Sequence, residues 1–292
     1  MALDTRPALT ASQQEQQLRG LDALETASTS TRTPGALWAW TWPKLAAVAL
    51  AVLVWQVVVW SGWKPSYVLP GPVPTLRTLL DSLGTGTFWQ ATGITLARGV
   101  VGFAVSAVVG LVLGVAVAQS QFLRAAIGSL ITGLQTMPSI AWFPLAILLF
   151  QLSEQAILFV ILIGAVPSIA NGVIGGVDYV PPLLVRAGRN IGANGLALYR
   201  HVILPAALPS IVSGLKQGWA FAWRSLLAGE LIVAIAYRPS LGQFLTQSRE
   251  LGEPTYMIAL MIAILVIGIM VDAVFASFDN SIRRNRGVSG NR

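Results

Sequence analysis

The sequence predicts an all-α integral membrane protein with about six transmembrane helices, and three observations support this fold class. Of the 292 residues, 54% are hydrophobic and 11% are charged, whereas soluble domains carry roughly 25% charged residues. The apolar residues gather into six segments of nearly the length, roughly 20 residues, that a helix needs to cross the hydrocarbon core. Tryptophans flank the first segment, as expected at a membrane interface. A water-soluble fold of this size would lack the polar residues to cover its surface.

Hydropathy places the six spans along most of the chain. They are Lys44–Trp60, Thr95–Ala118, Ala126–Phe150, Ala156–Val177, Ile211–Ala236 and Tyr256–Phe278. The first apolar run has no small-residue cleavage site behind it, so we interpret it as a retained span rather than a signal peptide. We predict a disordered cytoplasmic tail for residues 1–43, a membrane domain for residues 44–279, and a basic cytoplasmic tail for residues 280–292.

The basic residues predict the orientation of the spans. With the N-terminus in the cytoplasm, thirteen Lys and Arg residues fall in cytoplasmic segments and five in outer segments. The outer five are Lys64, Arg77, Arg98, Arg238 and Arg249. Because basic residues are in excess in cytoplasmic loops, both termini are predicted to be cytoplasmic.

Small residues and prolines give weaker indications about the spans. Gly102, Ser106, Gly110, Gly114 and Ala118 recur every four residues in the second span and form one helical face. Such a face lets helices approach closely, either within the subunit or against a second subunit. Three prolines in the third and fourth spans, Pro138, Pro144 and Pro167, are expected to kink their helices. Kinked helices suit the lining of a pathway, although membrane helices also contain proline for packing alone.

The inner connection, residues 178–210, predicts two short helices. The first extends from Leu183 to Ile191, preceded by two prolines and stopped by Gly192, and the second extends from Gly195 to Leu204. Glycine after a helix can take the left-handed conformation that ends it. Four residues, Arg186, Arg189, Arg200 and His201, make this connection basic. The two helices therefore predict a raised surface for a soluble partner, with His201 part of that surface rather than a proton relay.

This loop resembles the Glu-Ala-Ala loop of ABC importer permeases. That pattern is Glu-Ala-Ala, three residues, Gly, nine residues and Ile-x-Leu-Pro, and both spacings hold from residue 186 to residue 205. Arg186 stands where the family has Glu, Gly188 where it has Ala, and Val202 where it has Ile. The resemblance assigns ATPase coupling to Arg186, Ala187, Gly188, Arg189, Gly192, Ala193, Leu204 and Pro205. Arg186 puts in doubt the salt bridge that the family's Glu would make.

Three other stretches resemble the nitrate, sulfonate and taurine branch of this family. They are Thr95-Leu96-Ala97-Arg98, Met137-Pro138-Ser139-Ile140-Ala141-Trp142 followed by Pro144, and Gly229-Glu230-Leu231-Ile232. The resemblance covers residues 55–278. It implies a multi-pass bacterial plasma-membrane subunit that works as a homodimer, with two ATPase subunits inside and a substrate-binding protein outside. The implied substrate is a small oxyanion, with an aliphatic sulfonate first and taurine, nitrate or bicarbonate next. Some members of the branch carry heteroaromatic vitamin precursors.

Two charged residues lie in the fifth predicted span. Arg224 and Glu230 are expected to face a cavity or a partner, because charge inside the membrane is costly. Six residues on one helix correspond to about 600°, which leaves the two side chains about 120° apart around the helix axis. We therefore do not expect Arg224 and Glu230 to pair with each other. Arg224 could attract an anionic substrate, or it could reach the interface or another helix. Together with Met137 and Trp142, these residues are the candidates for the translocation pathway.

The absence of other motifs excludes several functions. The chain has no Gly-rich phosphate loop with a Lys, so ATP and magnesium are expected on the partner ATPase and no cofactor on this chain. With no cysteine and one histidine, neither a disulfide framework nor a metal cluster is predicted. The basic residues form no patch with interleaved aromatics, which argues against nucleic-acid binding. A secondary transporter would need inverted repeats and paired intramembrane carboxylates, and an intramembrane enzyme would need a nucleophile and a base.

Overall fold

The computed structural model describes residues 34–284, and this part of the chain is helical without strands. It divides into two compact units, one ending at Trp63 and one beginning at Lys64. The first unit contains helix α2 (Pro34–Trp60), which begins before the predicted Lys44 and includes Pro43. Its segment from Thr41 to Trp60 is long and apolar enough to cross a membrane. The first predicted span is therefore present as a helix.

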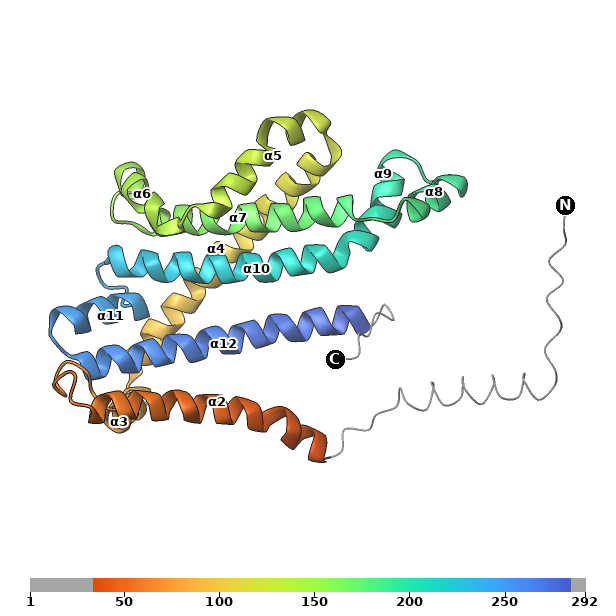
Figure 1. Cartoon of the computed structure of the whole chain (residues 1–292). Helices are drawn as coiled ribbons and strands as arrows, with labels where there is room; N and C mark the ends of the chain where they lie inside the picture. The colour runs from red at the N-terminus through yellow and green to blue at the C-terminus, as the bar shows by residue number, and fades with distance from the viewer. Residues whose placement is uncertain (1–33, 285–292) are drawn as a thin grey trace, which may run out of the picture. The chain divides into compact units, whose positions relative to one another are not determined.

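The second unit is a bundle of long helices with short helices at both ends (Figure 1). Its elements are α3 (Pro72–Leu83), α4 (Gly86–Gln119), α5 (Gln121–Thr136), η1 (Ser139–Trp142), α6 (Phe143–Phe150), α7 (Glu154–Asp178), α8 (Pro182–Asn190), α9 (Gly195–Leu198), η2 (Tyr199–Ile203), α10 (Leu204–Ile232), α11 (Leu241–Glu250) and α12 (Pro254–Arg284). Helix α7 packs against both α4 and α10. It supplies much of the core, because Val160, Ala165 and Ile169 are completely buried.

Five described helices are long and apolar enough to cross a membrane, or six if one bent pair counts as a span. That pair corresponds to the third predicted span, Ala126–Phe150, in which Pro138 and Pro144 were expected to kink the helix. Helix α5 and the segment Ser139–Phe150 meet at an angle of 107°. The break has a local cause, because Met137 is extended (φ −84°, ψ 128°) before Pro138, and the residue before a proline disfavours the helical region. Pro144 is tolerated within the first turn of α6.

The line of small residues on α4 packs within the subunit. A Cβ atom at Gly114 would lie 2.7 Å from the Cβ of Val173 and 3.0 Å from the Cα of Ala170, both on α7. The opposite face of α7 approaches α10 equally closely, since a Cβ at Gly214 would lie 2.7 Å from the Cα of Gly172. These contacts favour the intramolecular alternative for the small-residue face. Close backbone approach is the usual way in which helices associate in lipid.

Two helices have different bounds from those predicted. Helix α4 begins at Gly86, nine residues before the predicted start at Thr95, so Arg98 lies inside a long helix and not in an outer loop. Helix α10 begins at Leu204 instead of Ile211 and follows α9 and η2 without a break. The predicted second short helix is therefore the first part of a 38-residue helical segment, Gly195–Ile232. The predicted orientation of the termini remains a prediction.

Candidate functional site

The predicted first short helix of the inner connection is present as α8, within one residue of its expected bounds. Pro182 occupies its first turn, where a missing N–H does no harm. At its end, Gly192 has φ +89°. Its N–H donates to the carbonyl of Arg189 at 3.0 Å, and the N–H of Ala193 donates to the carbonyl of Gly188 at 3.0 Å. This pair of bonds is a Schellman cap, which fixes the direction in which the chain leaves α8.

The contact between α8 and the following helical segment depends on Gly188. This glycine is buried, and a Cβ there would lie 2.9 Å from the Cδ1 of Leu198 and 2.9 Å from the Cγ2 of Val202. The glycine thus allows α8 to rest directly on α9 and η2. An Ala at this position, as in the family pattern, would collide with Leu198 and Val202 in this chain.

The remaining coupling candidates occupy defined places around this contact. Arg186, Ala187 and Arg189 are exposed on α8, whereas Leu204 and Pro205 are half-buried in the first turn of α10. The ring of His201 is exposed in η2, with its Nδ1 3.0 Å from the carbonyl oxygen of Ala197. The structure thus brings the two ends of the resemblance pattern together, because α8 packs on the segment that leads into α10.

Two of the four pathway candidates line one pocket. Arg224 and Met137 both border a cavity of about 260 Å³ between the break after α5 and the middle of α10, together with Ser139 and Phe221. The Nε of Arg224 donates to the carbonyl of Ala220 at 3.0 Å. Its guanidinium carbon lies 4.8 Å from the centre of the Phe221 ring. The side chain is exposed, so its terminal N–H groups are available for a ligand.

The other two pathway candidates lie elsewhere. Trp142 is half-buried in the core, and its indole N–H is enclosed without a hydrogen-bond partner among the described residues. Glu230 is 1% exposed and does not contact Arg224, which confirms that the two charges are not a pair. The sequence grouped these four residues as one set of candidates, and the structure places two of them at a pocket, Trp142 in the hydrophobic core and Glu230 in a buried polar cluster.

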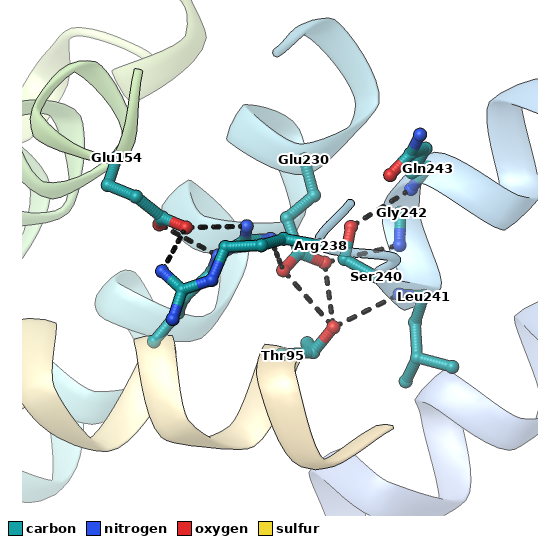
Figure 2. Close-up of polar contacts among 9 residues, drawn as sticks. Thr95, Glu154, Glu230, Arg238, Ser240, Leu241, Gly242 and Gln243 are labelled. Atoms are coloured by element: carbon teal, nitrogen blue, oxygen red, sulfur yellow. Dashed lines mark hydrogen bonds and ion pairs between the residues drawn. The ribbon is translucent and has the colours of Figure 1, made fainter. Parts of the chain in front are cut away.

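Glu230 belongs to a buried polar cluster that joins four helices (Figure 2). Its carboxylate accepts hydrogen bonds from the Oγ1 of Thr95 at 2.9 and 3.1 Å, from Nη1 of Arg98 at 2.9 Å, and from the N–H of Gly242 at 3.2 Å. The Oγ1 of Thr95 also accepts the N–H of Leu241 at 3.0 Å. The cluster fastens the beginning of α11 to α4 and to the end of α10.

Arg98 extends this cluster to α7. Its Nε and Nη2 donate to the two oxygens of Glu154, each at 2.8 Å, a bidentate geometry that strengthens an ion pair. Arg238, from the connection between α10 and α11, also donates to Glu154 at 2.9 Å. The side chain of Arg98 is 9% exposed, and that of Arg238 is 60% exposed. Sequence reasoning missed Arg98 because it was assigned to an outer segment, although its motif with Thr95 had been singled out.

An apolar bundle of helices long enough to cross a membrane, with a capped short helix at one end, defines the chain as a multi-pass membrane protein. Comparisons with known proteins agree with this class. The chain belongs to the family described as binding-protein-dependent transport system inner membrane component, whose model matches residues 106–284. Family members are transport subunits that act with other proteins, and the chain is accordingly a permease component in the plasma membrane.

Relatives from bacteria and archaea cover most of the chain. A protein of Methanocaldococcus jannaschii, named as an ABC transporter permease, is 31% identical over 78% of this chain and 86% of its own length. The nitrate import permease protein of Synechocystis is 29% identical over 81% of this chain and 88% of its own. The taurine transport system permease protein of Escherichia coli is 28% identical over 78% and 86%.

A solved structure supports the fold. The MetNI methionine ABC transporter, in an inward-facing conformation, matches with a TM-score of 0.56 over 68% of this chain and 95% of the matched chain, at 23% identity. Within residues 34–284, no group of three or more His, Asp or Glu side chains is placed to hold a metal ion.

Proposed function

We propose that this chain forms the transmembrane pathway of an ATP-driven importer for a small oxyanion. In this proposal two copies face each other with the pathway along their interface, two ATPase subunits bind on the cytoplasmic side, and a substrate-binding protein docks outside. Residues 44–279 are the permease domain. The ATPase subunits hydrolyse ATP, so this chain has no catalytic residue. Relatives named for nitrate, bicarbonate and taurine transport support an anionic substrate.

The observation that carries the substrate class is the environment of Arg224. A charged side chain in a spanning helix usually faces a water-filled cavity or a partner. Arg224 borders the smaller pocket, whose other lining residues carry no charge, and a larger one of about 660 Å³ that also includes Asp272. No carboxylate forms an ion pair with Arg224 in the described chain, and Asp272 pairs with Lys216. An unneutralised guanidinium can bind the oxygens of a nitrate, carboxylate or sulfonate group through two parallel hydrogen bonds. The pocket therefore favours anions, with an aliphatic sulfonate as the first candidate and taurine, nitrate and bicarbonate next.

The break between α5 and α6 supports the same position for the pathway. Irregular backbone at membrane depth is tolerated only where protein or water satisfies its polar groups. Met137 and Ser139 flank this break and also line the pocket that contains Arg224. A pathway at this position would place the non-helical segment beside water, where its backbone groups can be hydrated.

Coupling to ATP hydrolysis is assigned to α8. A permease does not bind ATP itself, so movement must pass through a contact surface. Helix α8 suits this role because Gly188 seats it on the segment continuous with α10, and α10 carries Arg224. A displacement of α8 would then be transmitted along one helical segment to the pocket.

Replacement of Arg224 tests the proposal. In proteoliposomes that contain the permease, its ATPase and its binding protein, Arg224→Gln is expected to lower uptake of labelled taurine or nitrate at least tenfold while assembly with the ATPase is retained. Lys216→Gln is the matched control, because it removes the same charge from α10 at a side chain that pairs with Asp272 at 3.6 Å. Equal uptake by both variants and the wild type would refute the role of Arg224. Failure of Arg224→Gln to accumulate in the membrane would instead indicate a structural role.

A further inference from the structure

Helix α8 presents a continuous stripe of side chains on the side opposite its contact with the subunit. Gly188 is buried and Val185 is half-buried against the following helical segment. Residues spaced by three and four share one face of a helix, so the residues at 183, 186, 187 and 190 face away from this contact. All four are exposed, and Leu183 is 75% exposed. This outward stripe consists of Leu183, Arg186, Ala187 and Asn190.

Arg186 is the only charged member of the outward stripe. It has no ion-pair partner in the part of the chain that the structure describes. The sequence also contains no Asp or Glu between Tyr179 and Gly229, and Asp178 at the start of the connection pairs with Arg124 at 2.8 Å. The other basic residues nearby, Arg189 and Arg200, are exposed as well. Among the residues that the structure describes, no carboxylate forms an ion pair with Arg186, Arg189 or Arg200.

The composition of this surface is that of a protein interface. Besides Leu183, the apolar side chains of Ile191 and Leu196 are 84% and 80% exposed at the same end of the bundle. Arginine beside exposed apolar groups is typical of the central contacts of interfaces, where Lys is depleted. Arginine also differs from lysine in offering a planar fork that matches a carboxylate. A carboxylate-bearing groove in a protein partner fits this pattern better than a lipid surface.

We propose that the ATPase partner presents a carboxylate to Arg186 in the groove that receives α8, so that the ion pair at this contact has the opposite polarity to that of permeases with Glu at this position. The proposal rests on the assignment of α8 to ATPase coupling and specifies the chemistry of that partner. The reason is electrostatic. A guanidinium enclosed at an interface without a counter-charge is strongly destabilising, whereas a bidentate pair compensates much of the desolvation. A cation in the groove would repel Arg186.

Charge reversal on α8 tests this pairing. In the purified complex, Arg186→Glu is expected to reduce binding-protein-stimulated ATP hydrolysis and co-purification of the ATPase at least tenfold. Arg200→Glu is the matched control, since it makes the same change in charge at an exposed arginine of η2, off the outward stripe and outside the residues assigned to coupling, and it should cost less than threefold. Replacing each exposed Asp and Glu of the ATPase by Lys, one at a time, should reveal a variant that restores activity to Arg186→Glu and not to Arg200→Glu.

The outcomes separate this inference from the proposed function. If the wild-type chain assembles with no ATPase, the proposed function fails. If the wild type assembles and Arg186→Glu behaves like it, only the carboxylate pairing is overturned. Equal losses in Arg186→Glu and Arg200→Glu would also overturn it, because a general charge effect would then explain both. A loss seen in vesicles with anionic lipid and absent in zwitterionic vesicles would show that Arg186 meets lipid headgroups and would overturn it as well.

Discussion

Removal of Arg98 is expected to destabilise the bundle far more than removal of Arg238, although both side chains bind the same carboxylate of Glu154. Arg98→Met keeps most of the length of the side chain and removes all of its hydrogen-bond donors. It leaves Glu230, whose side chain is 0% exposed, without a counter-charge, and it takes two bonds of 2.8 Å away from Glu154. Among the described residues, Thr95 and the N–H of Gly242 then remain as the donors to Glu230.

The size of the effect follows from burial. Removing one partner of a buried ion pair costs about 3–5 kcal/mol, because the other charge stays enclosed and unpaired. An exposed pair contributes about 0–1 kcal/mol. The side chain of Arg98 is 9% exposed and that of Arg238 is 60% exposed. For a domain of about 150–250 residues, 1 kcal/mol corresponds to about 2–4 °C in Tm. Arg98→Met should therefore lower Tm by about 6–20 °C, and Arg238→Met by about 4 °C or less.

Thermal unfolding of the purified subunit in detergent, followed by loss of the monodisperse peak in size-exclusion chromatography, measures this difference. The double variant Arg98→Met with Glu230→Gln should recover part of the lost stability, because the unpaired buried charge is then absent. The reasoning would be refuted by equal Tm values for Arg98→Met and Arg238→Met, or by a double variant that is less stable than the sum of the two single changes.

Three further results are expected. Gly192→Asp should leave the spans inserted while uptake and stimulated ATP hydrolysis collapse, since φ +89° costs a residue with a Cβ about 1 kcal/mol. A Cβ at Gly192 would meet nothing within 4 Å beyond its chain neighbours, so the side chain would project toward the partner. Normal uptake and normal stimulated ATP hydrolysis would contradict the coupling role. Gly114→Val should fail to accumulate in membranes because it collides with α7, while Gly133→Val, which meets nothing within 4 Å, should accumulate; equal expression would refute the packing argument. The chain contains no cysteine, so single cysteines can be introduced without background labelling. Tyr237→Cys should react with an impermeant thiol reagent outside intact cells, and Asn190→Cys should not. Labelling of Asn190→Cys and not of Tyr237→Cys would overturn the predicted orientation.

The sequence predicted the spans well where the length of an apolar run was the one signal that determined the helix. Long apolar runs with no internal break, such as those of α7 and α12, were placed within a few residues, because the length of the hydrocarbon core dictates them. The capped helix α8 was also predicted, since Gly192 marks a helix end by its backbone freedom. Hydropathy failed at α5 and α6, where Pro138 breaks the helix without reducing the apolar content.

The polar cluster was harder to predict for a different reason. Hydropathy places a charge at the end of a span and cannot tell that Arg98 will be neutralised by Glu154 and Glu230, which are 56 and 132 residues away in the chain. The sequence contained the signal as two short motifs, around Thr95 and around Glu230. Pairing them required the packing of α4 against α7 and α10, which only the three-dimensional structure supplies. The only sequence signal for the pocket beside Arg224 was the presence of a charged residue within a predicted span.

The most direct test of the central claim is transport by the reconstituted complex. Proteoliposomes containing the permease, its ATPase and its loaded binding protein should accumulate labelled taurine or nitrate only when ATP is present on the ATPase side, and an ATPase variant that cannot hydrolyse ATP should abolish accumulation. Uptake by the permease alone, driven by a proton or sodium gradient and indifferent to ATP, would contradict the account and identify a secondary transporter instead.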